Sequence, residues 1–338
     1  MIRVHVAVPV RDEEAGLPGL LQSLACQVGC DAIELSVHLL FDGCRDGGLA
    51  FARHVFETGS LAGKASLFSR AEPPNAGRAR RLAAEHALEG SEHEDDVILL
   101  TTDADTVPDA NWVRSAAAAL REVDVVAGYT TRDRASVLPA RDALETYLED
   151  LHSLRRQIDI IPYDPAPSHP WVGGANLGFR VEAYRQLDGF ARLASGEDKD
   201  IVDRARHLGL RVRHDRAMRV VTSSRMNGRA KGGLADALRF MADEVEEPRV
   251  EHPADAAQQY ARHAFARKVY AQRKGRCDWT RAEQALGATG DLRPLAKEAP
   301  NADAFAMKAV PALKTTRDVA LSEAAAILTT LNANQFRV

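Results

Sequence analysis

The first 130 residues alternate short apolar runs with segments of helical character, and this alternation limits the fold more than any other feature. Apolar runs occupy residues 4–10, 33–41, 96–102 and 123–128, and each has the length of a buried strand. Strands separated by helices in this way pair in parallel through βαβ crossovers. The sequence therefore predicts an α/β fold, with a mostly parallel central sheet flanked by helices.

The second half of the chain has a different pattern. Residues 161–170 contain four prolines, which predicts a loop. From residue 233 the pattern is helical, with breaks near prolines and glycines. We therefore expect a helical C-terminal region after the α/β part.

Charge and aromatic content exclude some partners. The 338 residues include 44 Lys and Arg against 48 Asp and Glu, a net charge of −4. A nucleic-acid-binding protein usually carries a basic excess, and 3 Trp, 6 Tyr and 10 Phe leave little for a base-stacking surface. We expect no nucleic-acid partner.

Cysteine spacing and hydropathy bear on the compartment. The four cysteines do not form two pairs at zinc-site spacing, and they are too few for a disulfide framework. The N-terminal residues do not have the pattern of a signal peptide, so we expect none, and the sequence has no apolar run of about 18 residues. We predict a cytoplasmic protein without an integral membrane segment, and peripheral association with a membrane stays open.

Paired carboxylates follow the apolar run at residues 96–102. They are Asp103 and Asp105, separated by Ala104. Ligands of open parallel sheets bind at the carboxyl ends of strands, and two carboxylates there can approach one hard cation that also binds phosphates. A helix N-cap with a spare acid is the alternative interpretation.

Other polar groups leave the same predicted sheet edge. Asp42 ends the second strand, and Pro9, Val10 and Arg11 end the first. A nucleotide base and ribose need hydrogen-bond acceptors and backbone groups of this kind. A turn-forming Asp-Gly pair is the alternative interpretation of Asp42.

Taken in chain order, segments of residues 2–232 resemble the family 2 glycosyltransferases, which have the GT-A fold. The family's opening Pro-x-x-Asn/Asp-Glu-Glu motif is similar to residues 9–14, and its Gly-x-x-Arg helix start is similar to residues 77–80. Its Asp-x-Asp, Gly-Gly-Ala-Asn and Glu-Asp motifs are similar to residues 103–105, 173–176 and 197–198. The resemblance implies a Rossmann-like GT-A domain and an inverting sugar transfer from a nucleoside-diphosphate donor.

The resemblance also implies roles for individual residues. Asp198 corresponds to the catalytic base, and Glu197 is its neighbour. The expected acceptor-binding residues are Trp171, Gly173, Gly174 and Asn176. The expected donor-binding residues are Pro9, Val10, Arg11, Glu13, Asp42, Arg80, Asp103, Ala104, Asp105, Arg225 and Arg229.

The implied cofactor is a divalent cation, Mn²⁺ or Mg²⁺. Asp105 would be its main ligand, and Asp103 would hold it through water or bind the ribose. Many relatives carry a histidine near residues 220–221 as a further ligand, whereas this chain has Thr-Ser-Ser-Arg at 222–225 and a histidine only at His214. The third ligand is therefore open.

Alternatives remain at three further positions. Arg225 and Arg229 lie in a glycine-containing basic segment that would add positive charge near a diphosphate, or would form a solvated loop. Trp171 would stack on a sugar ring or pack in the core. The acidic pair at 197–198 would also suit an ordinary helix N-terminus.

The resulting prediction is a metal-dependent glycosyltransferase, with a UDP-sugar favoured as donor over a GDP-sugar and the acceptor unknown. A sugar nucleotidyltransferase and a non-catalytic nucleotide-sugar-binding protein are the alternatives. We expect residues 1–130 to form the donor-binding half of a GT-A domain and residues 131–232 its acceptor-binding, catalytic half. Residues 233–338 would be a helical extension.

Overall fold

The computed structural model divides into two compact units with separate cores. It describes residues 1–59, 61–68, 75–91, 96–133, 139–224, 247–275 and 277–335. The first unit comprises residues 1–137, 171–204 and 211–239, and the second comprises residues 138–170, 205–210 and 240–338.

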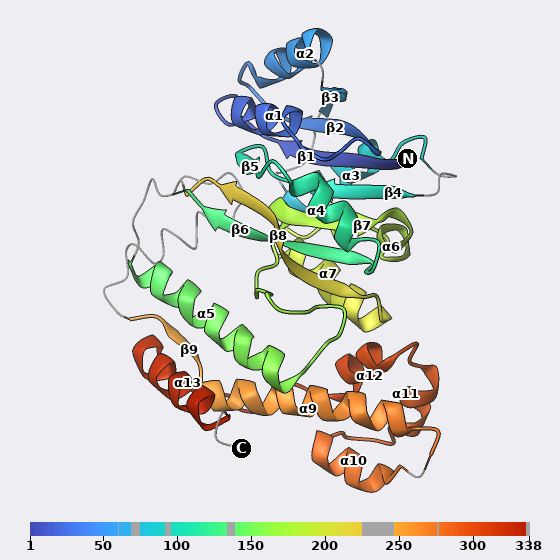
Figure 1. Ribbon diagram of the computed structural model, residues 1–338, viewed down its shortest axis with the longest axis vertical. Coiled ribbons are helices and arrows are strands. Elements are labelled where there is room, and N and C mark those ends of the chain that lie inside the picture. The colour runs from blue at the N-terminus through green and yellow to red at the C-terminus, as the bar shows by residue number, and fades with distance from the viewer. Residues whose placement is uncertain are drawn as a thin grey trace. The chain divides into compact units, whose positions relative to one another are not determined.

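The first unit is built on one large sheet (Figure 1). Within the described residues its strand order is β3-β2-β1-β4-β7-β6-β8-β5. Six of these strands run in one direction, whereas β7 and β5 are reversed. This arrangement confirms the mostly parallel α/β sheet expected from the sequence. The strands are β1 (Ile2–Val10), β2 (Ile33–Asp42), β3 (Gly63–Phe68), β4 (Val97–Thr101), β5 (Thr106–Pro108), β6 (Val125–Arg132), β7 (Leu177–Arg180) and β8 (Val212–Thr222).

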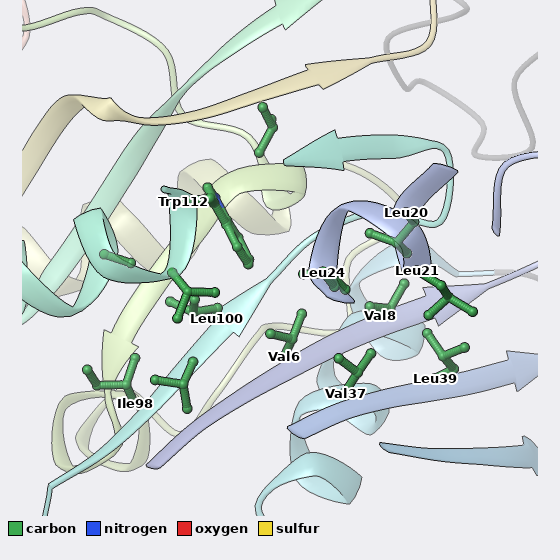
Figure 2. Packing of buried hydrophobic residues seen from close by; sticks show 14 of the residues in the cluster. Val6, Val8, Leu20, Leu21, Leu24, Val37, Leu39, Ile98, Leu100 and Trp112 are labelled. Atoms are coloured by element: carbon green, nitrogen blue, oxygen red, sulfur yellow. The ribbon is translucent and has the colours of Figure 1, made fainter. Parts of the chain in front are cut away.

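Helices cover both faces of this sheet. On one face, leucines of α1 meet valines of β1 and β2 in a fully buried cluster that also holds Trp112 of α4 (Figure 2). Successive strand residues point to opposite faces, so the residues between these valines face α3. The helical segments that begin in this unit are α1 (Leu17–Ala25), α2 (Gly48–Thr58), α3 (Ala76–Ala87), α4 (Trp112–Ala119), the short 3₁₀ helix η1 (Gly174–Asn176), α6 (Val181–Gln186) and α7 (Glu197–Leu208).

The face under α3 carries a polar layer of histidines. The Nδ1 atom of His5 lies 3.0 Å from Nε2 of His38, and Ser36 Oγ is within 3.0 Å of both nitrogens. His86 of α3 meets His38 edge to face, with ring centroids 6.2 Å apart, and bonds to Ser66. Burial, then the neighbouring His5 and His86, lower the pKa of His38 to about 4.

Three local predictions from the sequence are wrong. The acidic residues after Val10 predict a first helix from residue 11, but α1 begins at Leu17, because Asp12 has a left-handed backbone (φ 48°) and Glu13 O accepts bonds from Gly16 and Leu17. The pattern at 108–120 predicts a helix, but α4 begins only at Trp112, and Thr106–Pro108 forms β5 against β8. The apolar runs at 210–214 and 218–223 predict two strands, but they form one strand, β8, with an irregularity opposite residues 128 and 129.

The second unit is mainly helical, which confirms the expected helical C-terminal region. One of its cores joins Tyr147, Leu151 and Leu154 of α5 to Leu321 and Leu328 of α13. Two short strands, β9 (Arg249–Glu251) and β10 (Asp318–Ala320), pair beside it and were not expected. The helices are α5 (Pro139–Ile158), α9 (Pro253–Gln272), α10 (Trp279–Leu286), α11 (Arg293–Glu298), α12 (Ala302–Ala309) and α13 (Leu321–Gln335).

Throughout the described ranges, no helix combines the length and the apolar character needed to cross a bilayer.

Candidate functional site

The strand register brings the predicted site segments to one edge of the sheet. Val10 lies beside Phe41, and Ala7 lies beside Thr101, so β1, β2 and β4 end at the same edge. Because β7 runs in the opposite direction, its first residue, Leu177, lies beside Thr101. The segment at 171–176, which precedes β7, therefore meets the end of β4 and the Asp-x-Asp motif after it.

Arg80 lies at the centre of this edge. Asn75 caps α3 by accepting a bond from Arg78 N, and this first turn of the helix carries Arg80 to the site. The Arg80 guanidinium donates to Glu197 Oε1 at 3.1 Å (Nε) and to Asp103 Oδ1 at 3.0 Å (Nη1). Burial alone would lower the pKa of Arg80, but these two carboxylates raise it above its ordinary value.

Gly174 connects Arg80 to the predicted base. Its carbonyl oxygen accepts bonds from Arg80 Nη1 and from Thr101 Oγ1, both at 2.8 Å. Its N–H donates to Asp198 Oδ2 at 3.1 Å, and Lys199 N donates to Asp198 Oδ1 at 2.8 Å. The half-buried Asp198 carboxylate is thus oriented by two backbone donors at the start of α7.

The surroundings of the Asp-x-Asp motif differ on its two sides. Ala104 is buried between the half-buried Asp103 and Asp105. Beyond Asp105, Thr106 Oγ1 donates to Thr222 Oγ1 at 3.0 Å, so the end of β8 adjoins the motif. His214 pairs in register with Ala127, near the other end of β8. The described residues therefore place no histidine at the position where relatives have the third ligand.

The predicted base-binding edge lies between two interlocked loops, one after β1 and one after β2. Asp12 Oδ1 accepts a bond from Arg45 N at 2.7 Å, and Asp46 Oδ2 accepts one from Glu14 N at 2.8 Å. Glu14 Oε2 in turn accepts from Gly47 N at 2.9 Å. Carboxylates of each loop thus bind backbone donors of the other. Asp42 is buried at the start of the second loop.

Three side chains of these loops, Asp12, Cys44 and Asp46, are close enough together to bind one metal ion. One ligand atom each from Asp12, Cys44 and Asp46 lies within 4.8 Å of the others. Burial raises the pKa of the Cys44 thiol, whereas a metal ligand must be the thiolate. The thiol donates to Val10 O at 3.2 Å. These contacts show that Asp12, Cys44 and Asp46 connect the two loops by hydrogen bonds.

Asn176, predicted to bind an acceptor, is fully buried. Its side-chain oxygen accepts from Trp112 Nε1 at 2.8 Å, and its nitrogen donates to Tyr129 O and Met218 O. Trp171 and Gly173, in contrast, are half-buried. A contact with an acceptor stays a prediction for all three residues, and for Asn176 the visible contacts are internal.

Some residues fall outside these observations. Arg225 and Arg229 lie outside the described residues. The predicted site residues did not include Thr101 and Phe190, although Thr101 bonds to Gly174 and the Phe190 ring lies 5.9 Å from the Arg80 guanidinium. A hydroxyl inside an apolar strand, as at Thr101, is a readable signal, because buried hydroxyls need partners.

The fold and the site together define a class: an α/β protein with acidic side chains gathered at the carboxyl edge of its sheet. The sequence profile of the glycosyl transferase family group 2 matches residues 98–281. The chain belongs to this family, which confirms the predicted family and agrees with the predicted GT-A type. The matched range contains Asp103, Asp105, Glu197 and Asp198.

Solved structures with a similar course of the chain include the following two. S. aureus TarS 1-349 in complex with UDP-GlcNAc is 18% identical, with a TM-score of 0.49, over 91% of this chain and 90% of that chain. The mannosyltransferase PcManGT from Pyrobaculum calidifontis, in complex with GDP-Man and Mn²⁺, is 20% identical, with a TM-score of 0.46, over 99% of this chain and 80% of that chain. No curated protein matches the sequence.

Proposed function

We propose that this protein transfers a sugar from a nucleoside-diphosphate donor to an acceptor hydroxyl, with inversion at the anomeric carbon and with the help of a divalent cation. The observation that carries the proposal is the Asp103–Arg80–Glu197 chain of ion pairs, with Asp198 tied to it through Gly174. This series of contacts connects the Asp103 carboxylate of the Asp-x-Asp motif to the candidate base, Asp198, at one edge of the sheet. Family membership supplies the reaction class.

In this proposal the donor lies along the ends of β1, β2 and β4. Asp42 and the backbone of residues 9–11 bind the base, and the Asp-x-Asp motif faces the diphosphate. Arg225 and Arg229 belong to the same donor-side prediction. A UDP-sugar is the favoured donor and a GDP-sugar the second candidate.

The residues at 103–105 fit a hard divalent cation. Asp103 and Asp105 offer carboxylate oxygens, the ligands that Mg²⁺ and Mn²⁺ prefer. When bound, the cation would stabilise the negative charge that develops on the departing diphosphate. Asp105 would be the main ligand, because one oxygen of Asp103 already accepts from Arg80.

Asp198 would take the proton of the attacking acceptor hydroxyl. A general base must reach that hydroxyl within a hydrogen bond, and the two backbone donors fix the direction in which the carboxylate points. Direct attack opposite the leaving diphosphate inverts the anomeric carbon. Trp171 and Gly173 would lie on the acceptor side, with Glu197 and Gly174 beside the base.

Calorimetry with UDP and with GDP, each with and without Mn²⁺, tests this proposal. We expect metal-dependent binding of one of them, lost in Asp105→Asn. Asp109→Asn is the matched control, because Asp109 follows the motif closely and lies near Arg219, 4.0 Å away. Binding that is equally strong in Asp105→Asn, or absent with every nucleoside diphosphate tried, would contradict the proposal.

A further inference from the structure

We propose that Arg80 is a positioning residue: it holds the Asp103 and Glu197 carboxylates in place and, through Gly174, fixes the direction of the Asp198 carboxylate. This inference rests on the proposed function, which gives Asp103 to the donor side and Asp198 to the acceptor side. It replaces the direct donor contact that the resemblance implied for Arg80.

The first argument is that three of the five guanidinium N–H groups already have acceptors within the protein. Its side chain is only 9% exposed, and it donates to Glu197, Asp103 and the Gly174 carbonyl over 2.8–3.1 Å. The planar fork of an arginine presents these donors in fixed directions, which a lysine ammonium cannot reproduce. Arg80 is therefore fitted to its carboxylate and carbonyl partners.

The second argument is that Gly174 relays the position of Arg80 to Asp198. The carbonyl of Gly174 accepts from Arg80, and its N–H donates to Asp198 Oδ2. A Cβ added at Gly174 would lie 2.3–2.5 Å from three guanidinium atoms of Arg80. An alanine at this position would therefore displace the guanidinium from its present place.

The third argument is electrostatic. Asp103 and Glu197 both approach the same guanidinium, and Glu197 is only 5% exposed. Two carboxylates that approach each other in a part-buried site repel. The positive charge of Arg80, which pairs with both carboxylates, offsets this repulsion beside the base.

Substitutions at both ends of this relay test the inference. Arg80→Lys keeps the charge but loses the fork, and Gly174→Ala pushes against the guanidinium. We expect each to lower the release of nucleoside diphosphate from a UDP- or GDP-sugar, with water as acceptor, by about 100-fold, since a misplacement of about 1 Å can cost that factor. The Kd of the nucleoside diphosphate with Mn²⁺ should rise far less than turnover falls, because Asp105, the proposed main ligand of the cation, is unchanged.

Two controls separate this effect from a general loss of structure. Arg81→Lys alters the next residue of α3, which bonds to Glu85 and Asp188, and it should keep wild-type turnover. Gly173→Ala is the steric control for the free energy of unfolding, because its added Cβ meets nothing within 4 Å. Should Gly174→Ala fail to fold, Thr101→Val removes the second bond to the Gly174 carbonyl, with a smaller expected loss of turnover.

The double variant Arg80→Lys/Gly174→Ala tests whether the two substitutions act through the same Arg80–Gly174 contact. If it is, the double variant is no worse than the worse single variant, both in turnover and in the free energy of unfolding. Losses that multiply would overturn the linkage, and so would a Kd that rises in step with the loss of turnover. If the wild-type protein binds no nucleoside diphosphate, the proposed function fails and the positioning role fails with it. The free energies of unfolding of the single and double variants would still show whether Arg80 and Gly174 are energetically coupled.

Discussion

At the scale of single residues, Asp198 and Asp200 lie two positions apart on α7 but have different surroundings. The Asp198 carboxylate accepts from Gly174 and Lys199 at the site, whereas Asp200 pairs with Arg204 at 2.8 Å. Both are partly exposed acids near the start of the helix. Of the two, only Asp198 contacts the Gly174 segment, and it is the one that we propose as the base.

Asp198→Asn should therefore lower turnover by about 10²–10⁴-fold, the usual contribution of a positioned general base. The asparagine amide cannot take the proton of the acceptor hydroxyl, which accounts for the loss of turnover. It keeps an oxygen for the Gly174 N–H, so the site keeps its shape and binding of the nucleoside diphosphate should persist. Turnover and calorimetry on the same preparation measure both effects. Asp200→Asn is the matched control. Unchanged turnover in Asp198→Asn, with the nucleoside diphosphate still bound, would favour a different base or a non-catalytic binding protein.

Single residues also show what could be read from the sequence. The motif residues at 103–105, 174 and 197–198 were predicted, and the structure brings Asp103, Gly174, Glu197 and Asp198 together around Arg80. Their order along the chain indicated the sheet edge, because strand ends converge there. The partners of Arg80 could not be predicted, because they lie 23, 94 and 117 positions away and depend on the packing of α3.

At the scale of elements, the histidine layer joins α3 to the sheet. The groups that face His38 there are His5 and Ser36 from β1 and β2, Lys64 and Ser66 from β3, and His86 and Glu89 from α3 and the residues after it. Burial and the neighbouring His5, His86 and Lys64 all lower the pKa of His38, and only Glu89 raises it. The layer therefore favours a neutral His38.

The pH dependence of stability follows from this layer. The pKa of His38 is about 4 in the folded protein against 6.5 ordinarily, so between these values the folded state binds fewer protons than the unfolded state. Its contribution is complete above pH 6.5 and is lost as the pH falls towards 4. We expect a loss on the order of 2 kcal/mol, allowing for partial solvent screening.

Urea unfolding at pH 7 and at pH 4.5 measures this effect. His38→Gln should show a smaller difference in unfolding free energy between the two pH values than the wild type. His54→Gln, at an exposed histidine of α2, should keep the wild-type difference. An identical pH dependence in all three proteins would mean that other groups dominate the acid response.

Elements were predicted well where hydrophobic pattern decides, and poorly where distant pairing decides. The strands at 2–10, 33–42 and 97–101 have continuous apolar runs, and their ends were predicted within two residues. β5 has only three residues, and its pairing partner β8 lies more than a hundred positions away. β9 and β10 are equally short and distant from one another. Local sequence carries little information about such strands.

At the scale of the whole molecule, the second unit is assembled from segments that are distant in sequence. α5 precedes the Gly174 segment, yet its apolar residues pack with α9 and α13. The predicted boundary at 232/233 separates α5 from these partners. The division of residues 1–232 into donor and acceptor halves stays a prediction.

A chain shortened to residues 1–232 should therefore be destabilised and prone to aggregation, because it exposes Tyr147, Leu151 and Leu154. Calorimetric Tm and binding of an apolar dye measure this. In the full chain, Leu154→Ala should cost about 2–5 kcal/mol of unfolding free energy. Ile160→Ala, at a side chain that is 72% exposed, should cost less than about 0.5 kcal/mol. A well-folded short chain with wild-type Tm would contradict the shared core.

The interlocked loops after β1 and β2 have a consequence for how donor preference could change over evolution. Asp12 and Asp46 each accept a hydrogen bond from a backbone N–H of the opposite loop, and Glu14 accepts a third from Gly47 N. A replacement in one loop therefore removes hydrogen bonds that hold the other loop. Because the predicted base site lies between the two loops, both of its sides would change. New base selectivity would have to arise through paired replacements across the two loops, so the effects of such mutations should be strongly epistatic.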